Sequence, residues 1–211
     1  MYKIIFLFGL ISIIGINSSV HNTSSLIDYT DWKAGISKNK PLLAKQSLAT
    51  KQAYLFEVIA KSIPAYWIGT TWDFNGVTRT PQKGAIACGY FITTVLEDIG
   101  IQLERVKLAQ QVSSVMIKKL TVKVKNTTNF STLKTYISTG LKNDIFIIGL
   151  DFHTGFIVKE GTTFYFLHSN YINREGVIKE NIENSAALKG SSNYMIGSLL
   201  QNEILVQKWA K

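Results

Sequence analysis

The sequence has little of what makes a chain disordered, fibrous or disulfide-stapled. Only one of its 211 residues is cysteine, so no disulfide can form within the chain, and only three are proline. Charged residues make up 18% of the chain and hydrophobic residues 46%. This composition excludes a collagen-like repeat and a disordered tail, and it supplies enough apolar mass for a core. The length predicts one domain, or two small ones.

Acidic residues are outnumbered by basic ones, 14 against 23, which gives a formal net charge of +9. Such a balance favours an anionic partner, such as nucleic acid, a membrane surface or an acidic cell-wall polymer. The basic residues are dispersed along the chain, which argues against nucleic acid. One basic cluster could meet an anionic polymer, although a solvated helix end and strand face explain it equally well; its members are Lys118, Lys119, Lys123 and Lys125.

The first segment, residues 1–19, has the pattern of a secretory signal peptide. Lys3 precedes an apolar stretch from Ile4 to Ile16, and small polar residues follow it. The stretch is short for a permanent membrane span, and no cysteine near its end could carry a lipid anchor. We therefore expect a secreted or periplasmic protein without a stable membrane anchor. A retained N-terminal membrane helix is the alternative.

Helices are expected mainly in the first half of the remaining chain, residues 20–211, and strands in the second. Residues 20–40 look like a polar lead-in. Helical patterns cover Pro41–Ile63, Ala85–Ile99, Val106–Leu120, Ser131–Thr139 and Gln201–Ala210. Strand patterns cover Thr121–Lys125, Ile145–Leu150, Phe152–Lys159, Thr162–His168 and Tyr194–Leu200. This order predicts a single α+β domain in which N-terminal helices pack on an antiparallel sheet.

The single cysteine, Cys88, is the first candidate for chemistry. In an exported protein an unpaired thiol invites a functional explanation, although a buried cysteine can also act as a small hydrophobic residue. Cys88 lies at the start of a predicted helix, after the long loop Tyr66–Gly84. The positive end of the helix dipole is expected to lower the pKa of the thiol. Gly89 is expected to leave room for a substrate or an imidazole.

Two of the three histidines, His153 and His168, lie on neighbouring predicted strands. A hairpin that turns at Gly161 would set them close together across the strand pair. Gly155 follows His153 on the same strand face and is expected to leave an open patch beside the imidazole. With Cys88 these residues provide a nucleophile, a base and an orienting group.

Other polar and aromatic residues are weaker candidates. Asn170 is an alternative to His168 as the orienting group. Asp151 could polarise His153 or be a charge at the sheet edge. Trp67 and Trp72, in the loop before Cys88, could line a groove, although tryptophans more often pack in cores. The histidine spacing predicts no metal site, and no glycine-rich phosphate loop is present, so no cofactor is expected.

The order of these segments resembles the papain-like cell-wall peptidases of the NlpC type. In that family an aromatic-glycine loop precedes a helix that begins with the catalytic cysteine, and a strand beginning His-x-Gly follows later. Here the loop is YWIGTTWDFNG, the helix is ACGYFITTVLEDIGI, and the strands are HTGFIV and FYFLHS. Arg105 and Gln110–Gln111 follow the helix, as in the family. Ala87 and Gly89 replace the family's Asp and Ser, which suggests a distant subfamily.

The resemblance implies a papain-like fold with Cys88 as nucleophile, His153 as general base and His168 as third member. The backbone N–H of Cys88 would bind the oxyanion together with a second donor. Tyr66 matches the family's loop tyrosine in one alignment, and Trp72 takes that place in another. Gln82 is a rival donor, because it precedes Cys88 by the interval found in papain-like proteases.

The implied activity is that of a cysteine peptidase or amidase that cleaves amide bonds in peptidoglycan stem peptides. The expected partner is then peptidoglycan or another anionic cell-wall polymer. Two alternatives stay open: a non-catalytic cell-wall or glycan-binding domain on the same scaffold, and a secreted protease or acyltransferase that acts on protein or lipid.

Overall fold

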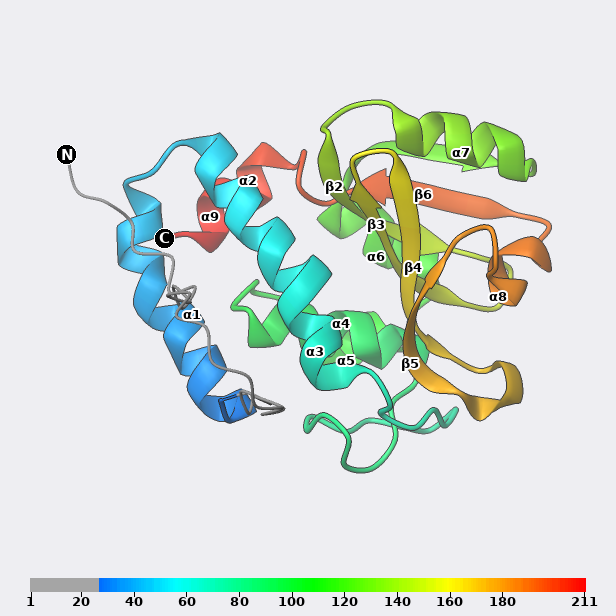
Figure 1. Cartoon of the computed structure of the whole chain (residues 1–211), viewed down its shortest axis with the longest axis horizontal. Helices are drawn as coiled ribbons and strands as arrows, with labels where there is room; N and C mark the ends of the chain where they lie inside the picture. Colours follow the sequence, from blue (N-terminus) through cyan, green and yellow to red (C-terminus); the bar gives the residue numbers. More distant parts are fainter. Residues whose placement is uncertain (1–26) are drawn as a thin grey trace, which may run out of the picture.

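A six-stranded antiparallel sheet with helices on both faces organises residues 27–211, the part of the chain that this computed structural model describes (Figure 1). The strand order across the sheet is β1-β6-β2-β3-β4-β5. The strands are β1 (Val122–Thr127), β2 (Asn143–Gly149), β3 (Thr154–Glu160), β4 (Thr163–Asn170), β5 (Gly176–Asn181) and β6 (Tyr194–Ser198). The expected α+β class is confirmed. The predicted signal peptide, residues 1–19, lies outside the described residues.

The helices fall into an N-terminal group, a central group and a few late elements. The first group is α1 (Tyr29–Ala44), α2 (Leu48–Glu57), the π-helix η1 (Val58–Ser62) and α3 (Ile63–Trp67). The central group is α4 (Cys88–Asp98), α5 (Arg105–Ala109) and α6 (Ser113–Leu120). The late elements are α7 (Phe130–Ser138), the 3₁₀-helix η2 (Ile172–Arg174), α8 (Ala186–Lys189) and α9 (Glu203–Trp209). Within residues 27–211 no helix has the length and apolarity needed to cross a bilayer.

Two hydrophobic clusters cover the two faces of the sheet. Ile145 and Ile147 of β2 belong to the cluster that includes α4 and α6, whereas Phe146 and Ile148 belong to the cluster that includes α7. Successive strand residues point to opposite faces, so an unbroken apolar run is buried on both. The sheet therefore lies between the α4–α6 side and the α7–α8 side, as Figure 1 shows.

The predicted lead-in is wrong, because residues 29–44 form α1. The Asp28 side chain accepts a hydrogen bond from the Thr30 N–H and caps this helix, and Pro41 lies inside it. Pro64 does not end the following helical run either, since α2, η1 and α3 follow one another without a break and Pro64 lies just after the π-helical turn η1. The sequence of α1 is largely polar and therefore does not indicate a helix. The helix packs against the hydrophobic core through Tyr29 and Trp32.

Two further predictions need correction in the middle and late chain. The single helix expected over Val106–Leu120 is two helices, α5 and α6. Strand β5 was not predicted, because the sequence GVIKEN mixes charged and apolar residues, as suits the edge of a sheet. The helix expected over Ala85–Ile99 exists as α4, with Gly100 following it at a φ of 85°. It begins only at Cys88, because Ala85 and Ile86 form β-bridges with Thr71 and Val77.

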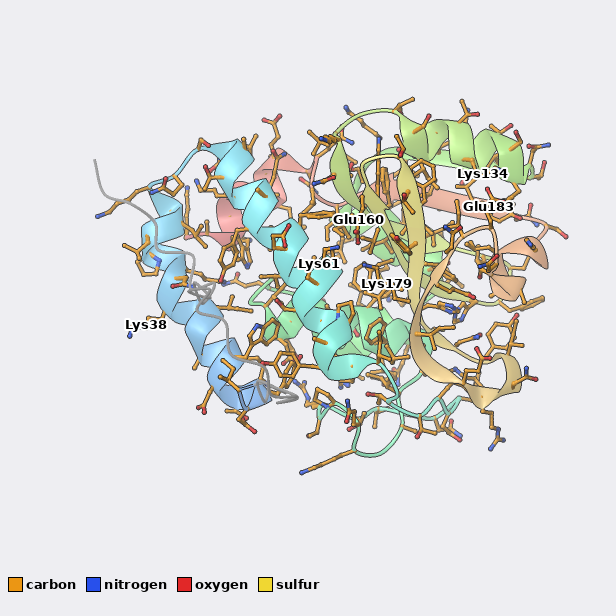
Figure 2. All side chains as sticks on the ribbon, in the orientation of Figure 1. Lys38, Lys61, Lys134, Glu160, Lys179 and Glu183 are labelled. Atoms are coloured by element: carbon orange, nitrogen blue, oxygen red, sulfur yellow. The ribbon has the colours of Figure 1, made fainter. Side chains whose placement is uncertain are left out.

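Ion pairs join the helical layer to the sheet (Figure 2). Glu160, the last residue of β3, accepts from Lys61 of η1 at 2.6 Å and from Lys179 of β5 at 2.5 Å. Lys134 of α7 pairs with Glu183 at 2.8 Å on the other side. These pairs are partly exposed, so each contributes little free energy, and the apolar clusters carry most of the stability.

Glycine at position 155 is required by close packing. The β3–β4 register pairs Phe156 with Leu167, so the next pair outward is Gly155 with His168. A Cβ on Gly155 would lie 2.5 Å from Cε2 of Phe166 and 2.7 Å from Cβ of His168. The expected open patch is therefore wrong: Gly155 is small so that the two rings of β4 can lie over it.

Replacing Gly155 with alanine should destabilise the fold by about 1–3 kcal/mol, because the added methyl overpacks this contact. Urea unfolding of the variant measures the change. Gly35→Ala is the matched control, since Gly35 lies inside α1 with open space around it. That variant should gain about 0.5–1 kcal/mol from helix propensity. An unchanged unfolding midpoint for Gly155→Ala would contradict the packing argument.

Candidate functional site

Cys88 is the first residue of α4, and the backbone at Ala87 is extended just before it. The thiol is half-buried. Burial raises the pKa of the thiol, and the nearby backbone N–H groups of Thr154 and Gly89 offset this shift only in part. The expected lowering by the helix dipole is therefore wrong, since desolvation is the larger effect.

A chain of hydrogen bonds starts at His153, the residue before β3. Its Nε2 lies 2.7 Å from Nδ1 of His168, and Nε2 of His168 lies 3.1 Å from Oε1 of Glu180. His168 is fully buried and stacks on Phe166, with ring centroids 3.9 Å apart. The predicted pairing of His153 with His168 is confirmed. Sequence reasoning missed Glu180, because it missed β5.

The carboxylate of Glu180 determines which ring nitrogens donate and which accept in these hydrogen bonds. Burial raises the pKa of Glu180, but hydrogen bonds from His168 and Ser185 outweigh burial, and the net shift is downward. An ionised carboxylate only accepts, so His168 donates through Nε2 and accepts through Nδ1. His153 must then donate through Nε2. Its other ring nitrogen, Nδ1, carries a lone pair and is the basic atom of the site.

Both histidines are neutral at neutral pH. Burial lowers the pKa of His153 well below its usual value, and the neighbouring His168 lowers it further. Burial also lowers the pKa of His168, although Glu180 opposes the shift. Together with the raised pKa of Cys88, these shifts describe a resting site with a neutral thiol and a neutral imidazole.

The thiol and the imidazole come from elements that pack together. Helix α4 lies against β3 and β4, and Thr154, whose backbone N–H lies near the thiol, directly follows His153 in the chain. Cys88 and His153, 65 positions apart in sequence, thus reach the same end of the sheet. His153 and His168 contact Phe166, which belongs to the cluster on the α7 side, whereas α4 covers the other face. The small residue after Cys88 serves packing: a Cβ on Gly89 would lie 2.6 Å from the carbonyl oxygen of Ala109. Gly89 admits α5, and the expected room for a substrate there is wrong.

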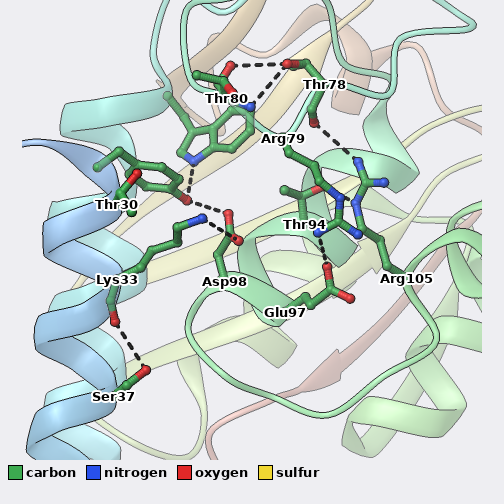
Figure 3. Close-up of polar contacts among 12 residues, drawn as sticks. Thr30, Lys33, Ser37, Thr78, Arg79, Thr80, Thr94, Glu97, Asp98 and Arg105 are labelled. Atoms are coloured by element: carbon green, nitrogen blue, oxygen red, sulfur yellow. Dashed lines mark hydrogen bonds and ion pairs between the residues drawn. The ribbon is translucent and has the colours of Figure 1, made fainter.

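Arg105 holds the loop that leads into Cys88 (Figure 3). Its Nε donates to Oγ1 of Thr94 at 2.7 Å, and its Nη2 donates to the carbonyl of Val77 at 2.8 Å. The guanidinium also lies over the Tyr90 ring, 4.9 Å from its centroid. On the sheet side, Oγ of Ser169 donates to the carbonyl of Ile86 at 2.7 Å. The loop is thus fastened to both α4 and β4, which fixes where α4 begins.

Tyr171 lies next to the His153 ring, and Trp72 lies next to Tyr171. The ring centroid of Tyr171 lies 5.0 Å from that of His153, and Trp72 lies 6.3 Å beyond Tyr171. Trp72 is half-buried and Tyr171 is 40% exposed, so both reach the surface beside the site. Trp67 is fully buried and donates to the Tyr29 hydroxyl at 2.9 Å. The groove role expected for Trp72 stays a prediction, whereas Trp67 belongs to the core.

Two predicted oxyanion donors are engaged by other backbone groups. The Tyr66 hydroxyl donates to the carbonyl of Ile27 at 3.0 Å, among the aromatic residues of α1. The Gln82 amide donates to the carbonyls of Tyr66 and Ile68, at 3.2 Å and 3.4 Å. Tyr66 therefore anchors α1 and Gln82 shapes the loop. Neither side chain keeps a free donor for an oxyanion, and both assignments are corrected.

Asn170 and Asp151 also have other partners. Asn170 donates to Glu175 at 2.7 Å and accepts from the Ile172 N–H at 3.0 Å, so it builds the turn after β4. His168, and not Asn170, orients His153.

Asp151 accepts from the Ser192 N–H at 2.7 Å and from the Asn193 amide at 2.8 Å. It ties two loops together and does not polarise the imidazole.

Within residues 27–211 no group of three or more His, Cys, Asp or Glu side chains could hold a metal ion. No family model, curated protein or solved structure matches the chain.

The buried imidazoles should make stability depend on pH. In the unfolded chain a histidine titrates near about 6.5, whereas both folded pKa values are lowered. Unfolding therefore takes up protons as the pH falls below about 6.5, and stability present above that value is lost toward acid. The limiting slope is about 1.4 kcal/mol per pH unit for each histidine.

Urea unfolding between pH 5 and 7 measures this slope, a window chosen because ordinary carboxylates stay ionised in it at about pH 5 and above. His153→Asn removes one of the titrating groups and should flatten the curve. The same slope in both proteins would show that His153 is not held neutral by burial.

Proposed function

We propose that the protein is an exported cysteine hydrolase on a papain-like scaffold that cleaves amide bonds. The observation that carries the proposal is the buried chain of hydrogen bonds from Glu180 through His168 to His153, at the end of the sheet where the loop before Cys88 is fastened to β4. A structural cysteine needs no such arrangement. A nucleophile, a base and an orienting chain are the parts that covalent catalysis requires.

The reaction begins from the neutral pair. As Sγ of Cys88 attacks the carbonyl carbon, the thiol proton passes to Nδ1 of His153, and a sulfur–carbon bond forms. The carbonyl oxygen becomes an oxyanion next to the backbone N–H of Cys88 at the start of α4. His153 becomes an imidazolium ion, and its Nε2–H hydrogen bond to His168 passes the stabilising effect of the Glu180 carboxylate to it.

The intermediate then collapses. The carbon–nitrogen bond breaks, His153 gives its proton to the leaving amine, and a thioester remains on Cys88. Water attacks the thioester while His153 takes a proton from that water. The sulfur–carbon bond then breaks, the acid is released, and His153 returns the proton to the sulfur of Cys88. The low pKa of His153 in its buried setting makes it a ready proton donor to the amine.

Peptidoglycan stem peptides are the proposed substrate. Three features support this: the NlpC-type order of the loop, cysteine and histidine segments, the predicted export signal, and the net charge of +9. The aromatic wall of Trp72 and Tyr171 supplies a surface beside His153 for a bound peptide. The proposed location is outside the cell membrane or in the periplasm, without a role in nucleic acid binding.

A non-catalytic cell-wall-binding domain on the same scaffold is the second candidate function. The observation that favours it is the raised pKa of Cys88, because a thiol that stays protonated is a poor nucleophile unless a base assists it.

Cys88→Ala separates these candidates. If the protein is a hydrolase, the variant should lose at least about a thousandfold in the rate of free amino group release from purified peptidoglycan, since nothing else forms the thioester. Wall binding, measured by co-sedimentation, and the thermal unfolding midpoint should stay unchanged. Equal release by the two proteins would overturn the hydrolase, and no release by either, with binding intact, would favour the binding domain.

Glu180→Gln tests the orienting chain. Glutamine has both a donor and an acceptor, so the His168 ring could reverse its hydrogen bonds and leave His153 with the wrong tautomer. We expect kcat to fall by about tenfold to a thousandfold with KM nearly unchanged. Glu183→Gln is the matched control, because Glu183 pairs only with Lys134 at the surface. A kcat equal to that of the wild type would remove Glu180 from the mechanism.

A further inference from the structure

The imidazole of His153 is almost enclosed by aromatic rings. The rings of Phe166, His168 and Tyr171 lie next to it, with centroids 5.8, 4.9 and 5.0 Å away. Phe166 and His168 are fully buried, whereas Tyr171 is 40% exposed and His153 itself only 5%. Of these neighbours Tyr171 alone reaches solvent, so the open side of the imidazole is the side that Tyr171 covers.

The small exposed part of His153 includes its basic nitrogen. Within residues 27–211 every buried side-chain nitrogen and oxygen has a hydrogen-bond partner. The imidazole uses Nε2 for its hydrogen bond to His168, and Nδ1 has no partner among the same residues. Nδ1 is therefore not buried. The atom that would accept a proton faces the opening beside Tyr171.

The backbone that carries Tyr171 is clamped by the side chain of Asn170. This amide accepts from the N–H of Ile172 at 3.0 Å and donates to the carboxylate of Glu175 at 2.7 Å. Asn170 is buried, so water competes little for these hydrogen bonds. The clamp closes the turn between β4 and β5 around Tyr171 and holds both of its ends.

The turn itself has an unfavourable conformation. Asn173 and Arg174 have φ values of 52° and 54°, in the left-handed region that disfavours residues with a Cβ. Gly176 follows at a φ of 80°, and a Cβ there would collide with the carbonyl oxygen of Thr70. Such a conformation persists only where its surroundings fix it. The turn therefore does not swing as a whole.

The side chain of Tyr171, by contrast, is held by ring contacts. Its ring lies 5.0 Å from that of His153 and 6.3 Å from that of Trp72, and within residues 27–211 its hydroxyl has no hydrogen-bond partner. A partly exposed side chain without a hydrogen bond can change rotamer while its backbone stays in place. The structure thus combines a fixed turn with a ring that is free to rotate.

We propose that Tyr171 is a positioning residue that controls access to His153: its ring covers the imidazole in the resting protein, and a substrate reaches Nδ1 by displacing it. The inference rests on the proposed function, which makes His153 the base. The ring also keeps water from the imidazole, and burial is the main cause of the lowered pKa of His153.

Chemical labelling of His153 tests the proposal. The probe is diethyl pyrocarbonate, which acylates the lone-pair nitrogen of a neutral imidazole, at about pH 7. Tyr171→Ala should raise the labelling rate of His153 by at least about fivefold, because the covering ring is gone. Trypsin separates the two histidines, since Lys159 lies between them, and mass spectrometry then measures each rate.

Tyr171→Phe is the matched control. It keeps the ring and removes only the hydroxyl, so His153 should be labelled at the wild-type rate. His168 is an internal control in every sample, because it is fully buried and both of its ring nitrogens are hydrogen-bonded. Its labelling rate should not change in either variant.

Two results would overturn the proposal. One is equal labelling of His153 in Tyr171→Ala and in the wild type, which would show that the ring does not limit access. The other is a parallel rise at His168, because Tyr171 would then support the fold instead of covering one imidazole.

The labelling result is independent of the hydrolase test. Unchanged labelling, with hydrolysis abolished by Cys88→Ala, would remove the role of Tyr171 and leave the hydrolase. The predicted labelling without hydrolysis by the wild type would remove the hydrolase and leave Tyr171 as the cover of His153.

Discussion

The arrangement of the site depends on one buried hydrogen bond, the 2.7 Å contact between Nε2 of His153 and Nδ1 of His168. Two imidazoles can share a hydrogen bond only if one donates and the other accepts, so at least one ring must be neutral. Burial keeps both neutral, and Glu180 decides which nitrogen of each ring carries the proton. The contact also requires a glycine at position 155, since a side chain there would displace His168.

The rest of the fold keeps this arrangement dry and in place. Arg105 fastens the loop before Cys88 to α4, and Ser169 fastens it to β4. Burial of Cys88 raises the pKa of its thiol, so the dipole of α4 does not produce a resting thiolate. A base-assisted thiol is consistent with this setting, because the charge appears only when the proton moves and the Glu180 carboxylate is already placed to stabilise the imidazolium ion.

Some of the site could be predicted from sequence because it depends on local pattern. The turn at Gly161 and two apolar strands predict that His153 and His168 are neighbours, and a helix following a long loop predicts where Cys88 lies. Glu180 could not be found in this way, because β5 is an edge strand whose mixed sequence carries no clear alternation. The donors proposed from the family resemblance, Tyr66 and Gln82, were wrong because distant carbonyls already use their hydrogen-bonding groups.

By itself the sequence determined the α+β class, a helix with Cys88 near its start and the pairing of the two histidines, since short-range periodicity and turn residues act over a few positions. Only the tertiary structure decided the direction of each pKa shift and the identity of the orienting carboxylate. Those properties depend on desolvation and on contacts between residues far apart in the chain, which no local pattern contains.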